Sequence, residues 1–292
     1  MDGKFKILSD STCDMPIEYL REQEITLAYM SYFFGNTEYN DGSEKRLSVK
    51  EFYNAVRQGR MPHTAQINPD TAKKLLLPFA RENTPLLCLV FSSALSGTCQ
   101  SFFIARDELL EEYPSWPVAV VDSRAASMGE GLLLDYAVSL RNKGLSLEET
   151  AADIETSKYQ LCHYFTVDDL HHLARGGRLS GVSALLGSIL GVKPLLYCSD
   201  EGKLLVKGKI RTRRRSLDWL ADEMQKHLLP GRYNRFFVSH GDCLEDAEYV
   251  ARRVTELTGL TDYMIHPIGP VIGTHSGPGT VALFFFGDRR EP

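Results

Sequence analysis

The chain has 292 residues, of which 43% are hydrophobic and 24% charged, and its formal net charge is −5. This composition is typical of a soluble globular protein, and the length favours two domains of ordinary size over one. The mild negative charge argues against a general affinity for nucleic acid or for anionic membrane surfaces.

The N-terminal stretch Met1–Ser9 lacks the apolar core of a signal peptide. The longest uncharged stretch, Leu179–Val192, is too short to span a bilayer and is interrupted by serine and glycine. We therefore expect a cytoplasmic protein whose contact with a membrane is at most transient.

The chain has six cysteines, and no two of them form a C-x-x-C pair. None shares a metal-like spacing with a histidine, and Cys88, Cys162 and Cys198 lie in apolar, strand-like runs. We expect reduced thiols and no metal site.

The first half of the chain alternates short apolar runs with amphipathic segments. Three runs are typical of buried parallel strands: Phe5–Leu8, Leu86–Phe91 and Val118–Val121. Helices are expected at about 48–57, from Asp70 to an end or kink at Pro78, and at 100–112, 130–141 and 147–158. The strand–loop–helix order predicts a doubly wound parallel sheet with its functional loops at the carboxyl ends of the strands.

The second half, from near Leu161, predicts a mixed α/β sheet. Residues 194–210 indicate a hairpin that turns at Asp200–Lys203. Further strands are expected at 164–167, 236–239, 263–268 and 280–286, and helices at 168–174, 216–229 and 244–257. We therefore expect an N-terminal α/β lobe of residues 1–160 and a C-terminal α/β lobe of residues 161–292, with a ligand between them.

Two hydroxyl side chains, Thr64 and Ser96, lie on loops that should rise above the first sheet; Thr64 is in the expected loop Met61–Pro69. Together they could bind a carboxylate or a phosphate, because each hydroxyl donates one hydrogen bond. Alternatively, both are local turn and cap residues, which is common for serine and threonine.

The stretch Arg175–Ser180 contains two adjacent glycines flanked by arginines. Glycines permit a tight turn that exposes backbone N–H groups, and the arginines would attract an anion. A helix C-cap with solvated arginines explains the pattern equally well. The other basic run, Arg211–Arg215, lacks interleaved aromatics and favours a helix N-terminus or a partner-docking face over nucleic-acid binding.

His275 lies within Gly273–Thr280, a run of turn-forming residues that predicts a shaped loop. Its imidazole could donate to a bound oxyanion or serve as an acid or base. A simple hydrogen-bonding role is the alternative.

The aliphatic segment Leu179–Val192 mixes large side chains with Gly, Ala and Ser, especially at 182–190. Such a segment could line an acyl tunnel, where each buried methylene contributes about 0.8 kcal/mol. A core helix is the more common explanation.

Several enzyme motifs are absent from the sequence. There is no G-x-S-x-G nucleophile elbow, no phosphate-binding G-x-x-x-x-G-K-[ST] and no H-E-x-x-H, and no glycine-rich fingerprint follows the first expected strand. We therefore expect no catalytic residue and no cofactor.

Taken in order, the loops of this chain resemble those of the DegV family, which has the EDD fold and includes the fatty-acid-binding subunits of bacterial fatty acid kinase. The resemblance covers nearly the whole chain. The matching stretches are Ser9–Asp14, Thr64–Gln66, Leu95–Thr98, Asp122–Ser123, Arg175–Arg178, Lys193–Pro194, Lys209–Arg211, His240–Asp242 and Ile272–Gly279.

The resemblance implies a two-lobed α/β fold with one long-chain fatty acid between the lobes. It implies that Thr64 and Ser96 hold the carboxylate, with His275 close by. Arg211 corresponds to a family arginine that supports phosphoryl transfer by the partner kinase. Four further residues are expected near the ligand: Arg175, Arg178, Gly97 and Thr274.

One loop departs from the family pattern. The family commonly has Thr-Ser-Gln-Pro where this chain has Thr64-Ala65-Gln66-Ile67-Asn68-Pro69. The threonine is retained, so the implied carboxylate contact is retained, but the shape of the loop should differ.

The leading hypothesis is a lipid-binding protein that presents the carboxylate of a fatty acid to an ATP-dependent fatty acid kinase, which forms the acyl phosphate. The alternative is a stand-alone hydrolase or acyl transferase that uses Ser96 and His275. A DNA-binding regulator is disfavoured by the acidic charge balance.

Overall fold

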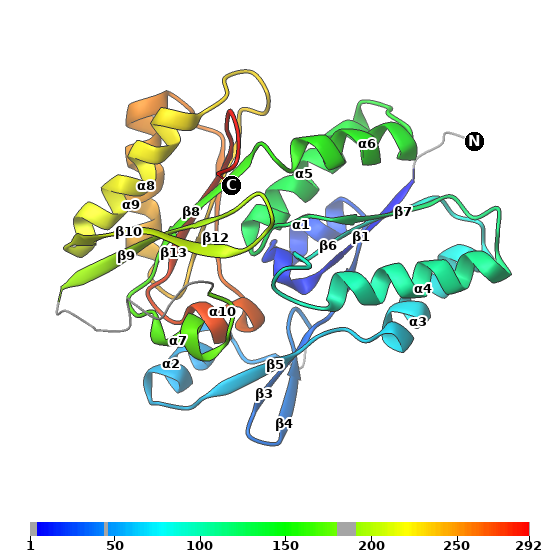
Figure 1. Ribbon diagram of the computed structural model, residues 1–292, viewed down its shortest axis with the longest axis horizontal. Coiled ribbons are helices and arrows are strands. Elements are labelled where there is room, and N and C mark those ends of the chain that lie inside the picture. Colours follow the sequence, from blue (N-terminus) through cyan, green and yellow to red (C-terminus); the bar gives the residue numbers. More distant parts are fainter. Residues whose placement is uncertain (1–4, 44–45, 180–190, 292) are drawn as a thin grey trace.

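The computed structural model describes residues 5–43, 46–179 and 191–291 (Figure 1). The aliphatic segment 182–190, which we considered as an acyl tunnel, lies outside the described residues. Among the helices of the described ranges, none is long and apolar enough to cross a membrane.

The N-terminal half contains a four-stranded parallel sheet, as the sequence predicts, with strand order β2-β1-β6-β7. Its strands are β1 (Lys6–Asp10), β2 (Ile25–Ala28), β6 (Leu86–Val90) and β7 (Val118–Asp122). The helices around it are α1 (Ile17–Glu22), α3 (Pro69–Arg81), α4 (Thr98–Glu112), α5 (Met128–Asn142) and α6 (Leu147–Ser157), and a 3₁₀ turn, η1, covers Ser11–Cys13.

Both faces of this sheet are covered, which makes it doubly wound. Along β6, Leu87 and Leu89 enter a core shared with α5 and α6, whereas Leu86 and Cys88 enter a second core shared with α3 and α4. Successive side chains of a strand point to opposite faces, so a run that is apolar at every position needs helices on both sides.

Three short strands form an additional antiparallel sheet, which the sequence did not predict. They are β3 (Ser31–Phe34), β4 (Thr37–Asn40) and β5 (Pro62–Ala65), in the order β4-β3-β5. The prediction of a loop at Met61–Pro69 is therefore wrong in its first part, because Thr64 pairs with Tyr32 of β3. Strands of four residues carry little periodicity, and long-range pairing decides them.

Pro78 does not end helix α3, which continues to Arg81. A proline removes one backbone hydrogen bond from a helix, and here buried Leu76 and Ala80 hold the following turn against the sheet. The nearby helix α2 (Val49–Arg57) begins at the predicted capping box, in which Ser48 and Glu51 bind each other's backbone N–H groups.

The C-terminal half contains a six-stranded mixed sheet in the order β10-β9-β8-β13-β11-β12. Its strands are β8 (Leu161–Thr166), β9 (Val192–Cys198), β10 (Leu204–Arg211), β11 (Phe236–His240), β12 (Tyr263–Pro267) and β13 (Val281–Phe286). The helices are α7 (His171–Arg175), α8 (Arg213–His227), α9 (Leu244–Thr258) and α10 (Pro270–Ser276). The predicted hairpin is confirmed as β9 and β10.

Helices α8 and α9 cover the outer face of this sheet, and α5 of the N-terminal half packs on its inner face (Figure 1). Along β13, Leu283 and Phe285 join the outer core, whereas Phe284 and Phe286 join the core that contains α5. The strands of each sheet come from one side of residue 160. The halves nevertheless share a core, so the division at that residue stays a prediction.

His275 lies on a helix and not on the expected loop. Helix α10 begins with Pro270 at its first position and ends at Gly277. Seven residues that include glycine and β-branched side chains have weak helix propensity. Packing against α2, α7 and β5 stabilises α10 in this position.

Candidate functional site

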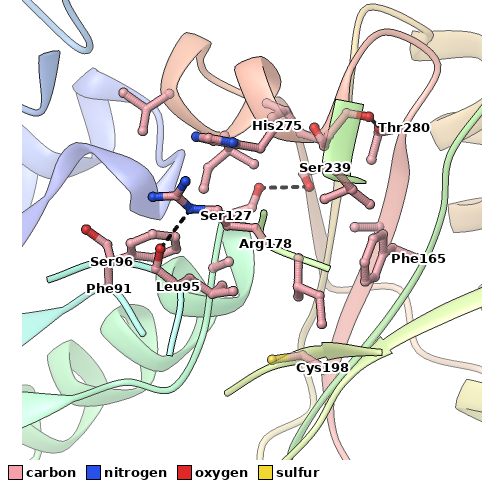
Figure 2. A pocket seen from close by; sticks show the side chains of 18 of the residues that line it. Phe91, Leu95, Ser96, Ser127, Phe165, Arg178, Cys198, Ser239, His275 and Thr280 are labelled. Atoms are coloured by element: carbon pink, nitrogen blue, oxygen red, sulfur yellow. Dashed lines mark hydrogen bonds between the residues drawn. The ribbon is translucent and has the colours of Figure 1, made fainter. Parts of the chain in front are cut away.

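A cavity of about 410 Å³ lies between the two halves, and side chains from both of them line it (Figure 2). The N-terminal half contributes β5, the loop after β6 and the start of α5. The C-terminal half contributes α10 and the inner face of its sheet. Most of the wall is apolar and includes Phe91, Leu95, Phe165, Leu204 and Phe284.

Strand register explains which sheet residues face the cavity. Phe165 of β8 pairs with Ala282 of β13, and His163 pairs with Phe284. These four residues line the cavity because alternate positions of paired strands share one face.

Thr64 and His275 meet in the wall of the cavity although 211 positions separate them in sequence. Thr64 Oγ1 lies 2.9 Å from His275 Nε2, within hydrogen-bonding distance. Strand β5 positions the threonine, and the last turn of α10 positions the histidine. The two side chains therefore act as one polar unit in the wall.

Burial lowers the pKa of His275 to about 4, with Arg178 and Arg175 adding to the effect. The imidazole is therefore neutral near pH 7. Its Nδ1 is buried without a hydrogen-bond partner and lies against Gly176, where a Cβ atom would overlap it. The glycine in the arginine-flanked stretch thus permits close contact between α7 and α10.

Ser96 lines the cavity and also caps its own loop. Its Oγ accepts a hydrogen bond from the Thr98 backbone at 3.2 Å and lies 3.0 Å from Thr98 Oγ1. Thr98 Oγ1 in turn accepts from the Ile67 backbone at 3.2 Å, which joins this loop to the one that follows Thr64. Gly97 does not line the cavity, but a Cβ atom there would overlap the side chain of Gln66, which does.

Ser96 and His275 do not form a hydrogen bond in the described part of the chain. His275 Nε2 contacts Thr64, and its Nδ1 faces Gly176. The arrangement differs from the nucleophile–base pair that a serine hydrolase requires.

The predicted arginines have different positions. Arg178 lines the cavity, and its guanidinium donates to the carbonyl groups of Leu95 at 3.2 Å and Gly176 at 2.6 Å (Figure 2). Arg175 lies outside the lining, next to His172 and Met61. Arg211 is exposed at the end of β10 and does not line the cavity either.

Thr274, the remaining predicted residue, is buried, and its hydroxyl donates to the carbonyl of Pro270 within α10. It does not line the cavity. Four predicted residues therefore share the cavity wall: Thr64, Ser96, Arg178 and His275.

Sequence reasoning missed several polar side chains of the wall, including Gln66, Ser127, His163 and Ser239. His163 and Ser239 lie within apolar strands, where no local pattern marks them. Ser127 precedes α5 with a positive φ of 54° and lies 3.0 Å from Ser239 Oγ.

Two buried carboxyl groups hold the beginning of α10. Asp14 accepts from the Gly269 backbone at 2.9 Å and from the hydroxyl of Ser127, and Asp41 accepts from the Val271 backbone at 3.0 Å. Burial raises the pKa of Asp41 to about 7 and that of Asp14 well above its usual value. These contacts fix the helix that carries His275.

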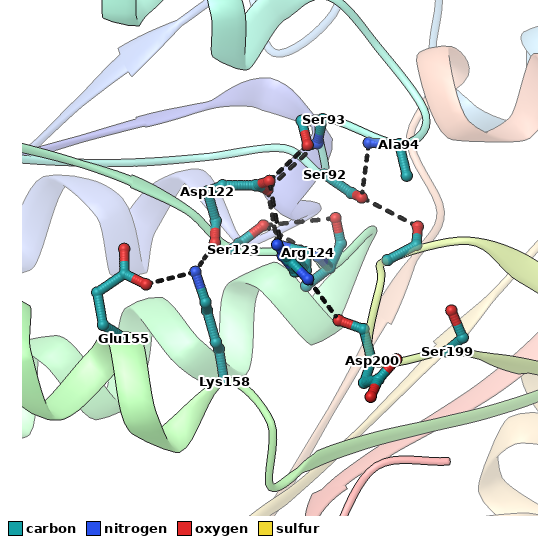
Figure 3. A network of polar contacts seen from close by, with 12 residues as sticks. Ser92, Ser93, Ala94, Asp122, Ser123, Arg124, Glu155, Lys158, Ser199 and Asp200 are labelled. Carbon is teal, nitrogen blue, oxygen red and sulfur yellow. Dashed lines mark hydrogen bonds and ion pairs between the residues drawn. The ribbon is translucent and has the colours of Figure 1, made fainter. Parts of the chain in front are cut away.

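The turn between β9 and β10 makes polar contacts with loops of the N-terminal half (Figure 3). Ser92 Oγ donates to the Gly202 carbonyl at 3.0 Å, and Arg124 donates to the Asp200 carbonyl at 3.1 Å. Cys198 and Leu204 stand on either side of this turn and line the cavity. The turn therefore connects the C-terminal sheet to loops of the N-terminal sheet.

Across the described ranges, one group of side chains has metal-like spacing: Glu223, His227 and Glu291. The ammonium of Lys207 contacts both carboxylates, at 2.7 Å for Glu223. The group is explained as an ion-pair network on the C-terminal half.

Known proteins similar to this chain share its full length. A family model described as "Uncharacterised protein, DegV family" matches residues 4–288. A DegV domain-containing protein of Clostridium perfringens is 43% identical over 289 residues, which is 99% of each chain.

Two solved structures have the same fold and modest sequence identity. A DegV lipid-binding protein of Thermotoga maritima superposes with a TM-score of 0.85 at 27% identity and covers 99% of this chain and 100% of its own. A stearic acid-binding protein of Eubacterium ventriosum gives a TM-score of 0.86 at 27% identity and covers 96% and 97%. Because the family match spans nearly all of the sequence and a relative shares 43% of its residues, the chain belongs to the DegV family.

Proposed function

We propose that this protein binds a long-chain fatty acid in the cavity between its halves, with the carboxylate at Thr64, Ser96 and His275. The observation that carries the proposal is a mainly apolar cavity whose wall includes these three polar side chains, with Thr64 Oγ1 2.9 Å from His275 Nε2. The lipid-binding and stearic acid-binding descriptions of the two solved relatives support it.

The hydrogen bonds already present leave donors for a carboxylate. If His275 Nε2 carries the imidazole proton and donates to Thr64 Oγ1, the Thr64 hydroxyl donates to the ligand. Ser96 Oγ accepts from the Thr98 backbone, and if the Thr98 hydroxyl also donates to it, the Ser96 proton is available to the ligand. Arg178 adds positive charge to the same wall.

These donors matter because a carboxylate is costly to bury without hydrogen bonds. Burial of the acyl chain favours binding, by about 0.8 kcal/mol for each methylene that leaves water. The cavity therefore favours a ligand with one anionic end and a long apolar body.

A second part of the proposal is that a separate ATP-dependent kinase phosphorylates the presented carboxylate. The absence of a nucleotide-binding motif in the sequence supports a partner over catalysis by this chain alone. Exposed Arg211, at the end of β10 and just before α8, would then offset the charge that develops during phosphoryl transfer. The cytoplasmic location expected from the sequence stays a prediction.

The test of ligand binding is lipid extraction from the purified protein, followed by titration of delipidated protein with palmitate and stearate. Recovery or uptake of a fatty acid supports the proposal. The absence of both would overturn it. The kinase step is tested separately, by adding a fatty acid kinase catalytic subunit and ATP to the loaded protein and measuring the acyl phosphate.

A further inference from the structure

One polar side chain, His163, stands in the apolar part of the cavity wall. It lies on β8, is only 4% exposed and lines the cavity. Its neighbours on this face of the sheet include Phe165, Ala282 and Phe284, and Ser239 pairs with Ala282. An aliphatic or aromatic residue would fill this position in an apolar wall without burying polar nitrogens.

His163 lacks the partners that buried polar groups normally have. Its Nε2 is buried without a hydrogen-bond partner and lies against Gly129 of α5, and Nδ1 forms no hydrogen bond within the described part of the chain, so Nδ1 is the nitrogen left for a ligand in the cavity. Burial lowers the pKa of this histidine well below its usual value, so the ring is neutral, with one donor nitrogen and one acceptor nitrogen. An unsatisfied buried polar group destabilises a protein by about 1–3 kcal/mol and requires an explanation.

The position of His163 separates it from the carboxylate end. The Thr280 hydroxyl donates to the Ser276 carbonyl at the end of α10, next to His275. Phe284, which pairs with His163, lies four residues further along β13, a distance of roughly 13 Å in an extended strand. His163 therefore faces the acyl chain of a ligand and not its head group.

The ring is held in place by its neighbours. It makes an edge-to-face contact with Phe284, with ring centroids 5.2 Å apart. A Cβ atom on Gly129 of α5 would lie 2.5 Å from His163 Nε2 and 2.8 Å from Phe284 Cδ1. Because Gly129 leaves this space, the first turn of α5 packs directly against the imidazole.

We infer that the preferred ligand is a fatty acid whose chain carries a hydroxyl group, and that the imidazole of His163 is the hydrogen-bonding partner of that hydroxyl. This inference rests on the proposed fatty-acid binding and specifies its substrate class. A hydroxyl group can both donate and accept, so it can pair with Nδ1 in either neutral tautomer of the ring. An unsubstituted chain leaves the ring without a partner.

The test is displacement of a fluorescent fatty acid from delipidated protein by stearate, by oleate and by hydroxystearic acids that differ in the position of the hydroxyl. We expect one position to bind about tenfold more tightly than the other positions, equivalent to roughly 1.4 kcal/mol. Oleate distinguishes a preference for the hydroxyl from a preference for a bend in the chain.

Two variants assign that preference to the histidine. His163→Leu removes both ring nitrogens and should abolish the preference, so that stearate and the hydroxystearic acids bind with similar affinity. His163→Gln keeps a donor and an acceptor and should retain part of it. Phe165→Leu, on the same strand and face, is the matched control and should change the affinities for all the acids by a similar factor. Thermal unfolding of each variant checks that it is folded.

The outcomes separate this inference from the function on which it rests. If stearate and the hydroxystearic acids bind equally well, or if the preference survives in His163→Leu, the inference is wrong and fatty-acid binding stands. If none of the acids binds, the proposed function itself fails. A single preferred hydroxyl position that depends on His163 supports both.

Discussion

Replacing Thr64 with valine removes one hydroxyl from the wall of the cavity and preserves the shape of the side chain. Valine is well suited to strand β5, so the backbone pairing with Tyr32 should remain. In the proposed complex the Thr64 hydroxyl donates to the carboxylate and accepts from His275, from which it is separated by 2.9 Å. Thr64→Val removes the head-group contact together with the hydrogen bond to His275, and the second is lost from the free and the bound protein alike, so the change in affinity reports the first.

The expected loss can be estimated from that contact. A hydrogen bond to a charged group contributes about 1.5–3 kcal/mol, and the dissociation constant should therefore rise roughly 10- to 100-fold. The factor should be the same for palmitate and stearate, because the acyl part of the cavity is unchanged. Isothermal titration of delipidated protein measures both constants.

Thr37→Val is the matched control. Thr37 lies exposed on β4 of the same small sheet and does not line the cavity, so its substitution should leave both affinities unchanged. The reasoning is refuted if Thr64→Val binds both acids within about twofold of the wild type, since that is less than the effect of any hydrogen bond to a charged group. A loss that grows with chain length would also contradict it.

Asp41→Asn should weaken the pH dependence of stability. The pKa of Asp41 is raised from 3.8 to about 7, so its contribution to the free energy of unfolding is complete below about pH 4 and is lost as pH rises through 7. The loss amounts to about 4 kcal/mol. Unfolding by urea at several pH values measures it. Gly176→Ala should displace His275, since the added Cβ overlaps its Nδ1. The free energy of fatty-acid binding should weaken by about 1–3 kcal/mol, as measured by isothermal titration. Gly202→Ala should lower the free energy of unfolding by about 1–2 kcal/mol, because its φ is +79° and the new Cβ would meet Ser92.

Each of these predictions has a control or a contradicting outcome. Gly208→Ala is the control for both glycine variants, because Gly208 has no positive φ and a Cβ atom there meets nothing within 4 Å. Equal effects of the three glycine substitutions would contradict the overlap argument. Unfolding free energies of Asp41→Asn that run parallel to those of the wild type over the same pH range would show that Asp41 does not titrate as described.

Local sequence signals were sufficient for much of the fold. The strand–loop–helix order of the first half predicted the doubly wound sheet, and capping boxes marked the helices that begin after Ser48 and Ser146. The polar turn Asp200–Lys203 marked the hairpin of β9 and β10. These features depend on residues close together in the chain, so a single sequence contains the information.

Local signals failed where the stabilising contacts are distant. Nothing local marks the role of Asp14, which adopts a left-handed conformation and holds Gly269 and Ser127 through its side chain. Helix α10 was expected as a loop because its own residues have weak helix propensity. Two of its hydrogen-bonding partners, Asp41 and Thr64, lie more than 200 positions away.

The residues of the candidate site also fall into those that the sequence marked and those that only the tertiary structure identified. The sequence by itself, through its ordered loops and their family resemblance, marked Thr64, Ser96, Arg178 and His275. Only the tertiary structure brought Thr64 within 2.9 Å of His275 and placed His163 in the cavity wall. Turn and cap chemistry is local, whereas a cavity is formed by side chains of separate strands and helices, and their register and packing are set only when the whole chain folds.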